Sequence, residues 1–421
     1  MKKRILIVGS GGREHAIGWK LAKSSRVGKL YFAPGNGGTL GLGENISINV
    51  EAIKDILQFV EEKQIDLIVV GPEVPLALGI VDESVKKSLR IFGPTKAATQ
   101  LESSKAWAVR FMEENKIPHP KSEIFTDVSS AFSYIEKLKG ECVVKADGLA
   151  AGKGVYMCNT LSEAEKALKE IMISRVFGSA GETVVIQEKL VGREVSVMAF
   201  CDGKVAIPII AAQDYKRIYD RDRGSNTGGM GAYAPSKIRV TVLKKMQRLL
   251  TLVVDRMAEK NMPYIGVLYG GFMIVGSEVY VLEFNCRMGD PETQVQLPLL
   301  ESDLLAILEA CIEGKMTPDL VKFSEQTSLS VVLASGGYPG TYKKDMPING
   351  LHRQNGVTVF HAGTRLIDNQ IHTNGGRVLN ITATADSLEK AREKVYSVIG
   401  ESISFEGMQY RTDIGKAASY K

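Results

Sequence analysis

The segment EFNCRMGDPET, residues 283–293, places polar side chains at the end of an apolar strand. Because side chains alternate along a strand, Glu283 and Asn285 should share one face while Phe284 points into the core. A carboxylate and an amide oxygen on one face suit Mg²⁺, which takes few protein ligands and shares phosphate oxygens for the rest. Arg287 would reach the same side, where a guanidinium can bind a carboxylate or neutralise a phosphoryl group. Taken alone, this pattern fits a strand of surface salt bridges equally well.

Two further polar segments favour chemistry over a salt-bridged surface. The apolar strand in residues 184–196 (VVIQEKLVGREVS) breaks at Gln187-Glu188 and places Glu194 after a glycine. Such an edge could pair its backbone with a purine, while an acid holds the ribose hydroxyls. Residues 213–235 mix acidic and basic side chains with four glycines between apolar strands, which is typical of a functional loop.

The loop VGSGGREHA, residues 8–16, follows an apolar strand and opens a helix. In the dinucleotide register G-x-G-x-x-G the first two glycines fit but Glu14 holds the third position, so support for NAD is weak. The backbone N–H groups of residues 11–13 could still hold a phosphate at the helix start, beside the loop PGNGGT at 34–39. A tight turn that needs positive φ is the alternative.

A second glycine-rich segment, KADGLAAGKGV at residues 145–155, lies between two predicted strands. It is not a Walker A loop, because only three residues separate its glycines and Gly154 stands where Ser or Thr would bind magnesium. The segment could instead be a hairpin that folds over a triphosphate, with Lys145 fixed on the strand and Lys153 carried on the hairpin. A surface hairpin without function is the alternative.

The order of the predicted elements divides the chain into three regions. Residues 4–100 alternate apolar strands with helices, which predicts a doubly wound parallel sheet with ligands at the carboxyl ends of its strands. A helix and a proline-marked linker follow. Short strands with one long helix, at about 243–257, then predict a larger α+β body. The last region is β-rich and ends with a helix near 387–399, which predicts a small C-terminal domain.

The bulk composition fits a multidomain protein with small anionic substrates. At 421 residues, 44% hydrophobic and 24% charged, the chain is too long for one core and has the composition of a soluble globular protein. The net charge of +5 comes without a basic arm, which argues against nucleic acid. Five scattered cysteines without a CxxC pair favour a reducing cytoplasm. We expect no signal peptide, and no apolar run approaches the ~18 residues of a membrane span.

In this order the segments resemble the ATP-grasp superfamily and, within it, the glycinamide ribonucleotide synthetase family. The resemblance covers essentially the whole chain, and its NTGGMGA and RMGDPE segments are highly specific. One departure is Met288, where the family has Phe or Leu; it leaves the charged positions untouched. The other segments that carry the likeness are GSGGREHA, PGNGGT, GPEVPL, ESSKAWA, KADGLAAGKGV, QEKLVGREVS, EFNCRMGDPET and VVLASGGYPG.

The resemblance implies a ligase of de novo purine biosynthesis. ATP phosphorylates the carboxylate of glycine, and the amine of 5-phosphoribosylamine attacks the glycyl phosphate to give glycinamide ribonucleotide, ADP and phosphate. It implies that Arg287, Lys145 and Asp214 act in catalysis, with Asp214 on the ammonium of glycine, and that Glu283 and Asn285 hold Mg²⁺ or Mn²⁺. The implied ATP contacts are Lys105, Lys145, Gly152, Lys153, Glu188, Leu190 and Glu194. The implied substrate contacts are Gly11, Arg13, Glu14, Asn36, Gly37, Asp214, Asp290, Pro291 and Thr293.

The resemblance also sets expectations for organisation and partners. The small-molecule partners would be ATP, glycine and 5-phosphoribosylamine, handled by a cytoplasmic monomer or weak dimer without nucleic acid, membrane or the fused downstream activities of larger eukaryotic versions. The expected division is 1–101 for an N-terminal α/β domain, 102–122 for a linker helix, 123–190 for the ATP-grasp lid, 191–325 for the ATP-grasp core and 326–421 for the C-terminal domain.

Three rival functions stay open at this stage. The nearest is an ATP-grasp ligase with another acid or amine substrate, such as a biotin-carboxylase-like enzyme, because the ATP half is shared across the superfamily. An NAD-dependent oxidoreductase would rest on the loop at residues 8–16 alone. A non-catalytic nucleotide sensor is the third.

Overall fold

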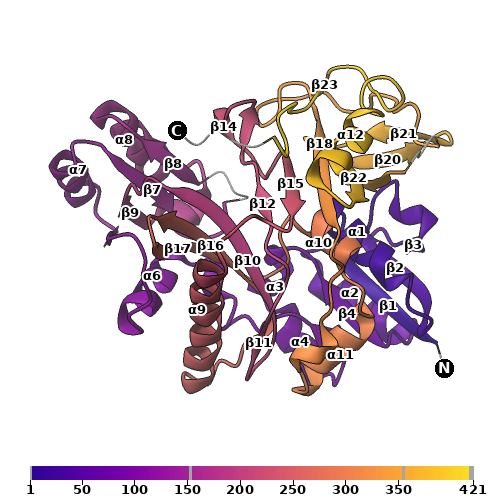
Figure 1. The fold of residues 1–421 in the computed structure, drawn as a ribbon. Coiled ribbons are helices and arrows are strands. Elements are labelled where there is room, and N and C mark those ends of the chain that lie inside the picture. Colours follow the sequence, from indigo (N-terminus) through magenta and orange to yellow (C-terminus); the bar gives the residue numbers. More distant parts are fainter. Residues whose placement is uncertain (1, 151–153, 353–355, 417–421) are drawn as a thin grey trace.

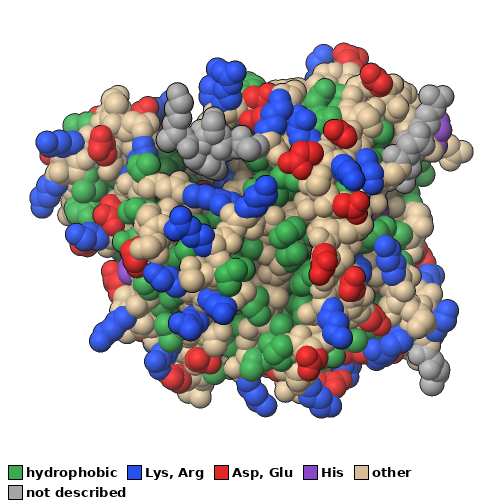
Figure 2. Space-filling model, in the orientation of Figure 1, with side chains coloured by type: hydrophobic (Ala, Val, Ile, Leu, Met, Phe, Trp, Pro, Cys, Tyr) green, Lys and Arg blue, Asp and Glu red, His purple; other side chains and the backbone are tan. Residues whose placement is uncertain are grey.

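The computed structural model describes residues 2–150, 154–352 and 356–416. Within these residues the strands form four sheets of four to six strands and two separate hairpins, with helices packed around them (Figure 1). None of the described helices is long and apolar enough to cross a membrane. On the face shown in Figure 2, Lys and Arg side chains are interspersed with Asp and Glu side chains, in keeping with the net charge of +5.

The N-terminal region is the predicted doubly wound parallel sheet. Its strand order is β3-β2-β1-β4-β5, and every neighbouring pair is parallel. The apolar run Ile5–Val8 of β1 is fully buried, because helices cover both faces of the sheet. The strands are β1 (Lys3–Gly9), β2 (Val27–Pro34), β3 (Glu44–Asn45), β4 (Leu67–Val70) and β5 (Ile91–Phe92), and the helices are α1 (Gly12–Leu21), η1 (Thr39–Gly41), α2 (Ile53–Glu62), α3 (Glu73–Leu78) and α4 (Ile80–Lys86).

The linker that was predicted as one helix is two helices. A short α5 (Gln100–Ser103) is followed directly by α6 (Lys105–Glu114), and the break falls at Ser104, whose backbone is extended. The hydroxyl of Ser104 accepts a hydrogen bond from Trp107 N at 3.0 Å, which caps the second helix.

An antiparallel sheet of order β6-β9-β7-β8 forms the next part, at the left of Figure 1. Two of its strands, β7 and β8, flank the glycine-rich segment 145–155 as predicted, β9 is the predicted apolar strand that begins at residue 184, and β6 is an additional edge strand. Two shorter helices that the sequence analysis did not identify, α7 and α8, pack on this sheet and share its core. The elements are β6 (Ser122–Phe125), α7 (Val128–Lys137), β7 (Cys142–Ala146), β8 (Val155–Cys158), α8 (Leu161–Leu168), the π-helix η2 (Lys169–Ile173), η3 (Gly178–Gly181) and β9 (Val184–Glu188).

A second antiparallel sheet, of order β11-β10-β16-β17, runs through the centre of the molecule. Its last two strands, β16 and β17, form a hairpin, with Gly276 at φ +63° in the turn. The predicted long helix α9 packs against this sheet through Met246, Leu250 and Val253. The elements are β10 (Arg193–Asp202), β11 (Ala206–Pro208), α9 (Val240–Glu259), β16 (Ile265–Val275), β17 (Glu278–Asn285), α10 (Thr293–Leu299) and α11 (Leu304–Glu313).

The C-terminal sheet recruits part of the glycine-rich segment 213–235. Strands β12 and β15 of that segment extend the sheet order β12-β15-β18-β22-β19, so the segment is not simply the loop that was predicted. The strands are β12 (Gln213–Asp214), β15 (Gly231–Ala234), β18 (Thr327–Ser335), β19 (Thr358–His361), β22 (Arg377–Ala385) and β23 (Met408–Gln409), which pairs with β18. The other elements are the hairpins β13 (Arg217–Tyr219)–β14 (Arg223–Asn226) and β20 (Thr364–Ile367)–β21 (Gln370–Thr373), with η4 (Pro318–Leu320) and α12 (Leu388–Tyr396).

One hydrophobic core joins the three regions. It contains Ile5 and Phe32 of the N-terminal sheet, Phe200 and Tyr269 of the central sheet, and Phe360 of the C-terminal sheet. The carboxyl ends of β1 and β4 therefore meet the end of β17 and the start of β22 around one space, which is the site described next.

Candidate active site

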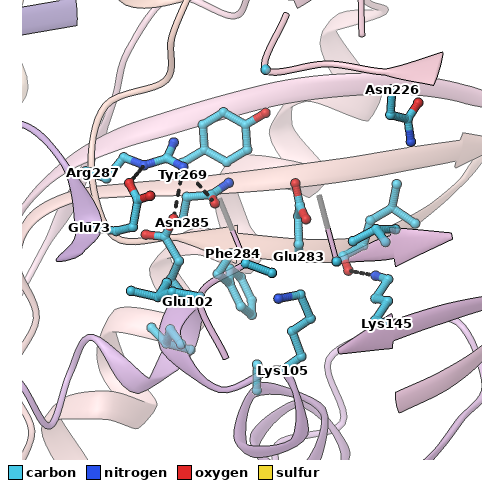
Figure 3. Close-up of a pocket in the computed structure, with 18 of the residues that line it drawn as sticks. Glu73, Glu102, Lys105, Lys145, Asn226, Tyr269, Glu283, Phe284, Asn285 and Arg287 are labelled. Carbon is cyan, nitrogen blue, oxygen red and sulfur yellow. Dashed lines mark hydrogen bonds and ion pairs between the residues drawn. The ribbon is translucent and has the colours of Figure 1, made fainter. Parts of the chain in front are cut away.

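A cavity of about 410 Å³ lies at this junction. Its walls come from α3, α5 and α6 on one side, β7 and the start of β8 on another, and β16 and β17 across the floor (Figure 3). Residues within the segments 214–228 and 290–292, and Arg377 of the C-terminal region, also line it. Within the described residues it holds eight of the predicted site residues: Arg13, Lys105, Lys145, Asp214, Glu283, Asn285, Arg287 and Asp290.

Glu283 and Asn285 lie on the same side of β17, and Phe284 between them points the other way (Figure 3). This is the alternation expected from the sequence. Although burial alone would raise the pKa of Glu283, the ammonium groups of Lys216 and Lys145 outweigh it and lower that pKa. Glu283 is therefore a carboxylate at neutral pH, beside an amide oxygen.

Arg287 is held at the end of β17 by three side chains. Its Nε lies 3.2 Å from Glu73 Oε2, and its Nη2 lies 2.9 Å from Glu102 Oε1. Nη2 also donates to Asn285 Oδ1 at 3.2 Å. The guanidinium is thus fixed next to the Glu283–Asn285 face, as the short spacing in sequence suggested.

Two of the predicted ATP contacts, Lys105 and Lys145, line the cavity. Lys145 Nζ donates to the carbonyl of Leu282 at 3.0 Å, and burial lowers the pKa of Lys145 to about 8. Lys105 Nζ donates to the carbonyl of Gly148 at 2.9 Å, at the base of the hairpin. The predicted ATP residues Gly152 and Lys153 lie outside the described residues.

Two of the predicted ATP contacts, Glu188 and Glu194, have partners within the protein. Glu188 Oε1 accepts a hydrogen bond from Lys121 N at 2.9 Å, and Glu194 forms an ion pair with Lys216. Neither they nor Leu190 are among the described residues that line the cavity, whose wall at this end is formed by Val185 and Gln187.

Asp214 lies in β12 and faces the cavity. Burial raises the pKa of Asp214 to about 8; Lys216 opposes this shift, while Glu292 and Glu194 add to it. An acid held in this way gains its charge most readily when a cation binds beside it.

Two of the predicted phosphoribosyl contacts, Arg13 and Asp290, line the cavity. Asp290 forms an ion pair with Arg377 at 3.3 Å. Burial alone would raise the pKa of Asp290, but the guanidiniums of Arg377 and Arg13 lower it, so Asp290 carries a charge.

The start of α1, where a bound phosphate was predicted, has carboxylate acceptors from the protein itself. Gly11 N donates to Glu14 Oε2 at 2.5 Å, and Arg13 N lies 3.4 Å from Asp290 Oδ2. Two of the three N–H groups that were expected to hold a phosphate are therefore already paired.

The remaining predicted substrate residues are engaged within the fold. The Asn36 amide donates to the carbonyls of Ser10 and His361, each at 2.8 Å, and so ties both glycine loops to the C-terminal sheet. The hydroxyl of Thr293 donates to the carbonyl of Gly289 at 2.5 Å. In the described part of the chain, the cavity wall does not include Gly11, Glu14, Asn36, Gly37, Pro291 or Thr293.

Sequence reasoning assigned no role to several polar residues that line the cavity, among them Glu73, Glu102, Tyr269, Glu292 and Arg377. The first two lie in the GPEVPL and ESSKAWA segments, so their position in those segments was a usable signal. Arg377 reaches the cavity from β22 and donates to the carbonyls of Gly228 and Asp290, each at 2.7 Å. No local pattern in the sequence foretells that contact.

The site fits a divalent cation that shares its shell with a nucleotide. In the described residues there is no group of three or more His, Cys, Asp or Glu side chains that could hold a metal alone. The carboxylate of Glu283 and the amide oxygen of Asn285 offer hard oxygen donors, and phosphates would supply the rest.

The fold and this arrangement define an ATP-grasp protein, a class that uses ATP with a divalent metal. Family models of phosphoribosylglycinamide synthetase match residues 3–102 (N domain), 103–293 (ATP-grasp (A) domain) and 328–417 (C domain). The chain therefore belongs to the phosphoribosylglycinamide synthetase family.

Relatives and solved structures agree with this. The phosphoribosylamine–glycine ligase of Nostoc sp. is 46% identical over 98% of this chain and 99% of that protein. The trifunctional purine biosynthetic protein adenosine-3 of Gallus gallus is also 46% identical, but this chain spans only 42% of its length. The crystal structure of the Thermotoga maritima phosphoribosylamine–glycine ligase has a TM-score of 0.87 at 36% identity, covering 98% of this chain and 100% of that one.

A more distant structure shares the fold alone. The biotin carboxylase domain of a Hydrogenobacter thermophilus 2-oxoglutarate carboxylase, solved with MgADP and bicarbonate, has a TM-score of 0.75 at 15% identity. It covers 97% of this chain and 92% of that one. At this identity the likeness carries no statement about substrate.

Proposed function

We propose that the protein is an ATP-dependent ligase that joins glycine to 5-phosphoribosylamine. The products are glycinamide ribonucleotide, ADP and phosphate, in purine biosynthesis. The observation that carries the proposal is that one cavity brings together two chemically different sets of side chains. Glu283, Asn285 and Lys145 suit a metal-bound polyphosphate, and Asp214 and Arg13 suit the other substrates.

In the first step, a carboxylate oxygen of glycine attacks the γ-phosphorus of ATP and ADP leaves. This step asks mainly for positioning and for neutralisation of charge. Lys105 and Lys145 carry positive charge toward the phosphates, and Lys153 would add a third from the hairpin. Arg287, held beside Asn285, stabilises the transferring phosphoryl group.

In the second step, the amine of phosphoribosylamine attacks the carbonyl carbon of glycyl phosphate and phosphate leaves with one former carboxylate oxygen. The amine is already a nucleophile, so no side chain needs to act as one. Asp214 binds the ammonium group of glycine, which keeps the substrate oriented through both steps. Water would hydrolyse glycyl phosphate, so the reacting groups must be shielded from water until the amine attacks.

Glu283 and Asn285 would hold the metal, Mg²⁺ or Mn²⁺, together with the phosphates of ATP. When bound, the ion neutralises phosphate charge. We assign Glu188, Leu190 and Glu194 with Gly152 to the nucleotide. Lys216 must release Glu194 for that carboxylate to bind the ribose, because the two form an ion pair.

The phosphoribosyl group is assigned to the part of the cavity that Arg13 and Asp290 line. Asn36, Gly37, Glu14 and Thr293 act there by fixing the loops, since their side chains or backbone groups bond within the fold. Gly11 and Pro291 adjoin the same loops. This part of the proposal draws its support from Arg13 and Asp290, which alone of the set line the cavity.

The proposal includes the expected partners and organisation. The five-part division at 101, 122, 190 and 325, a monomer or weak dimer, and a cytoplasmic location remain part of it. All five cysteines are free and buried, which supports a reducing compartment.

The test is an omission experiment with purified protein, Mg²⁺ and ATP. We expect ADP only when glycine and phosphoribosylamine are both present, with glycinamide ribonucleotide identified by its mass. Turnover with neither would refute the proposal, and ADP formation that depends on bicarbonate would favour the biotin-carboxylase rival. An NADH fluorescence change on binding would favour an oxidoreductase. Full turnover by Glu283→Ala would refute the metal assignment, and ATP binding without any turnover would favour a nucleotide sensor.

A further inference from the structure

Arg287 is clamped by two acids that come from separate parts of the chain. Glu73 lies at the start of α3 in the N-terminal region, and Glu102 lies in α5, the first helix of the linker that leads to the sheet β6-β9-β7-β8. We term these two residues the acid clamp. Figure 3 shows both carboxylates directed at the guanidinium.

Glu102 has a partner for each of its carboxylate oxygens. Oε1 lies 2.9 Å from Arg287 Nη2, and Oε2 accepts a hydrogen bond from Cys286 N at 2.6 Å. The residue is only 8% exposed. Glu102 therefore bonds both to the backbone of Cys286 and to the side chain of Arg287 at the end of β17, and little of its surface is exposed to a substrate.

Arg287 also bonds to Asn285, the candidate metal ligand. Arg287 Nη2, the nitrogen that pairs with Glu102, also donates to Asn285 Oδ1 at 3.2 Å. This bond fixes which end of the Asn285 amide is the oxygen and where it points. A displaced guanidinium would leave that amide free to rotate.

The charge of Arg287 affects the pKa values of both Glu102 and Glu73. Burial raises the pKa of Glu102 to about 7, and the charge of Arg287 opposes this rise. Burial alone would also raise the pKa of Glu73, but Arg287 and Arg13 lower it. The positive charge of Arg287 thus favours the ionised form of both carboxylates, and the two carboxylates hold the guanidinium in position.

We propose that Glu102 is a positioning residue for the ligation: it aims Arg287 into the cavity and, through Arg287, orients Asn285 Oδ1 toward the metal. This rests on the proposed function for the role of Arg287. Glu73 holds the opposite edge of the guanidinium from the N-terminal region. The acid clamp thereby keeps Arg287 at a fixed distance from the N-terminal region, which would bind the amine substrate.

The informative variant is Glu102→Gln. A glutamine side chain has one acceptor oxygen where Glu102 uses two, so either Arg287 or Cys286 N loses its acceptor. We expect kcat to fall roughly 100-fold while the KM for ATP stays within about threefold, since a misplaced catalytic group affects the chemical step more than binding. Glu102→Asp keeps both oxygens and should recover at least about tenfold of that loss. A kcat for Glu102→Gln within about twofold of the parent would overturn the proposal.

A double-mutant cycle separates positioning from general structural damage. If Glu102 acts through Arg287, adding Glu102→Gln to Arg287→Lys should lower kcat by less than about threefold further. Full additivity of the two losses would contradict the proposal. Glu309→Gln is the matched control, because Glu309 is also a largely buried acid with two cationic partners, Lys3 and Arg26, far from the cavity. It should leave kcat unchanged.

Metal binding gives a second readout that does not depend on turnover. Mn²⁺ bound with a non-hydrolysable ATP analogue can be measured by electron paramagnetic resonance, and we expect its Kd to rise roughly tenfold in Glu102→Gln. An unchanged Kd would remove the Asn285 part of the proposal. Failure of the ligase assignment would appear separately, as a parent protein that makes no product from glycine and phosphoribosylamine. If Glu102→Gln fails to fold, the same measurements on Glu73→Gln decide, because Glu73 holds the other edge of the Arg287 guanidinium: parent-like kcat and Kd would overturn the proposal.

Discussion

Glycine should bind more tightly as the pH rises from 6 to 8, because Asp214 must lose a proton before it can pair with an ammonium group. Burial raises the pKa of this acid to about 8, well above its usual value. A raised pKa means that the free protein holds the proton below that pH. Binding of glycine must then release it, so the apparent affinity falls as the pH is lowered.

The size of the effect follows from the ionised fraction. With a pKa of about 8, roughly 1% of Asp214 is ionised at pH 6 and about half at pH 8, so the KM for glycine should fall by roughly 50-fold over this interval. The ammonium group of glycine stays protonated throughout, and it therefore adds nothing to the slope. The KM for ATP should not follow the same curve.

Steady-state kinetics at saturating ATP and phosphoribosylamine measures this directly. Asp214→Asn removes the titrating group, so its KM for glycine should be high and independent of pH between 6 and 8. A flat profile in the parent protein, or the same slope in Asp214→Asn, would refute the assignment of Asp214 to the ammonium group.

Three other outcomes are expected. In Arg287→Lys the charge is kept, but a lysine side chain cannot contact Glu73, Glu102 and Asn285 together. We therefore expect kcat to fall roughly 100-fold or more. A change confined to the KM of one substrate would make Arg287 a binding group instead. Because burial lowers the pKa of Lys145 to about 8, its positive charge is lost above that pH and kcat should decline there. Lys145→Arg should move this decline in kcat to higher pH. If the pH profile does not move, the decline belongs to another group. A Cβ at Gly228 would lie 2.8 Å from Arg377 Cζ, so Gly228→Ala should displace the flexible side chain of Arg377. We expect activity to fall roughly tenfold while Tm changes by only a few degrees. Parent-like activity would show that Arg377 does not shape the site.

Local periodicity accounts for what could be predicted. The alternation of Glu283, Phe284 and Asn285 follows from strand geometry alone, and the parallel N-terminal sheet follows from its alternating strands and helices. The same reasoning missed helices α7 and α8, although each begins with a capping side chain, Asp127 or Thr160.

Contacts between distant segments account for what could not be predicted. Asn36 was expected at a substrate, yet its amide bonds to Ser10 and to His361, more than 300 residues away. Glycine spacing identified the loop at the start of α1 but could not show that Glu14 and Asp290 would occupy its N–H groups. Arg377 enters the cavity from a strand whose own sequence carries no sign of it.

The central claim is that one cavity joins the two halves of the reaction through glycyl phosphate. It is tested most directly with glycine labelled with oxygen-18 in its carboxylate. Attack of the amine on the acyl phosphate must send one former carboxylate oxygen into inorganic phosphate, so one labelled oxygen should appear there per turnover. Phosphate without label, formed at the same rate as glycinamide ribonucleotide, would contradict the account.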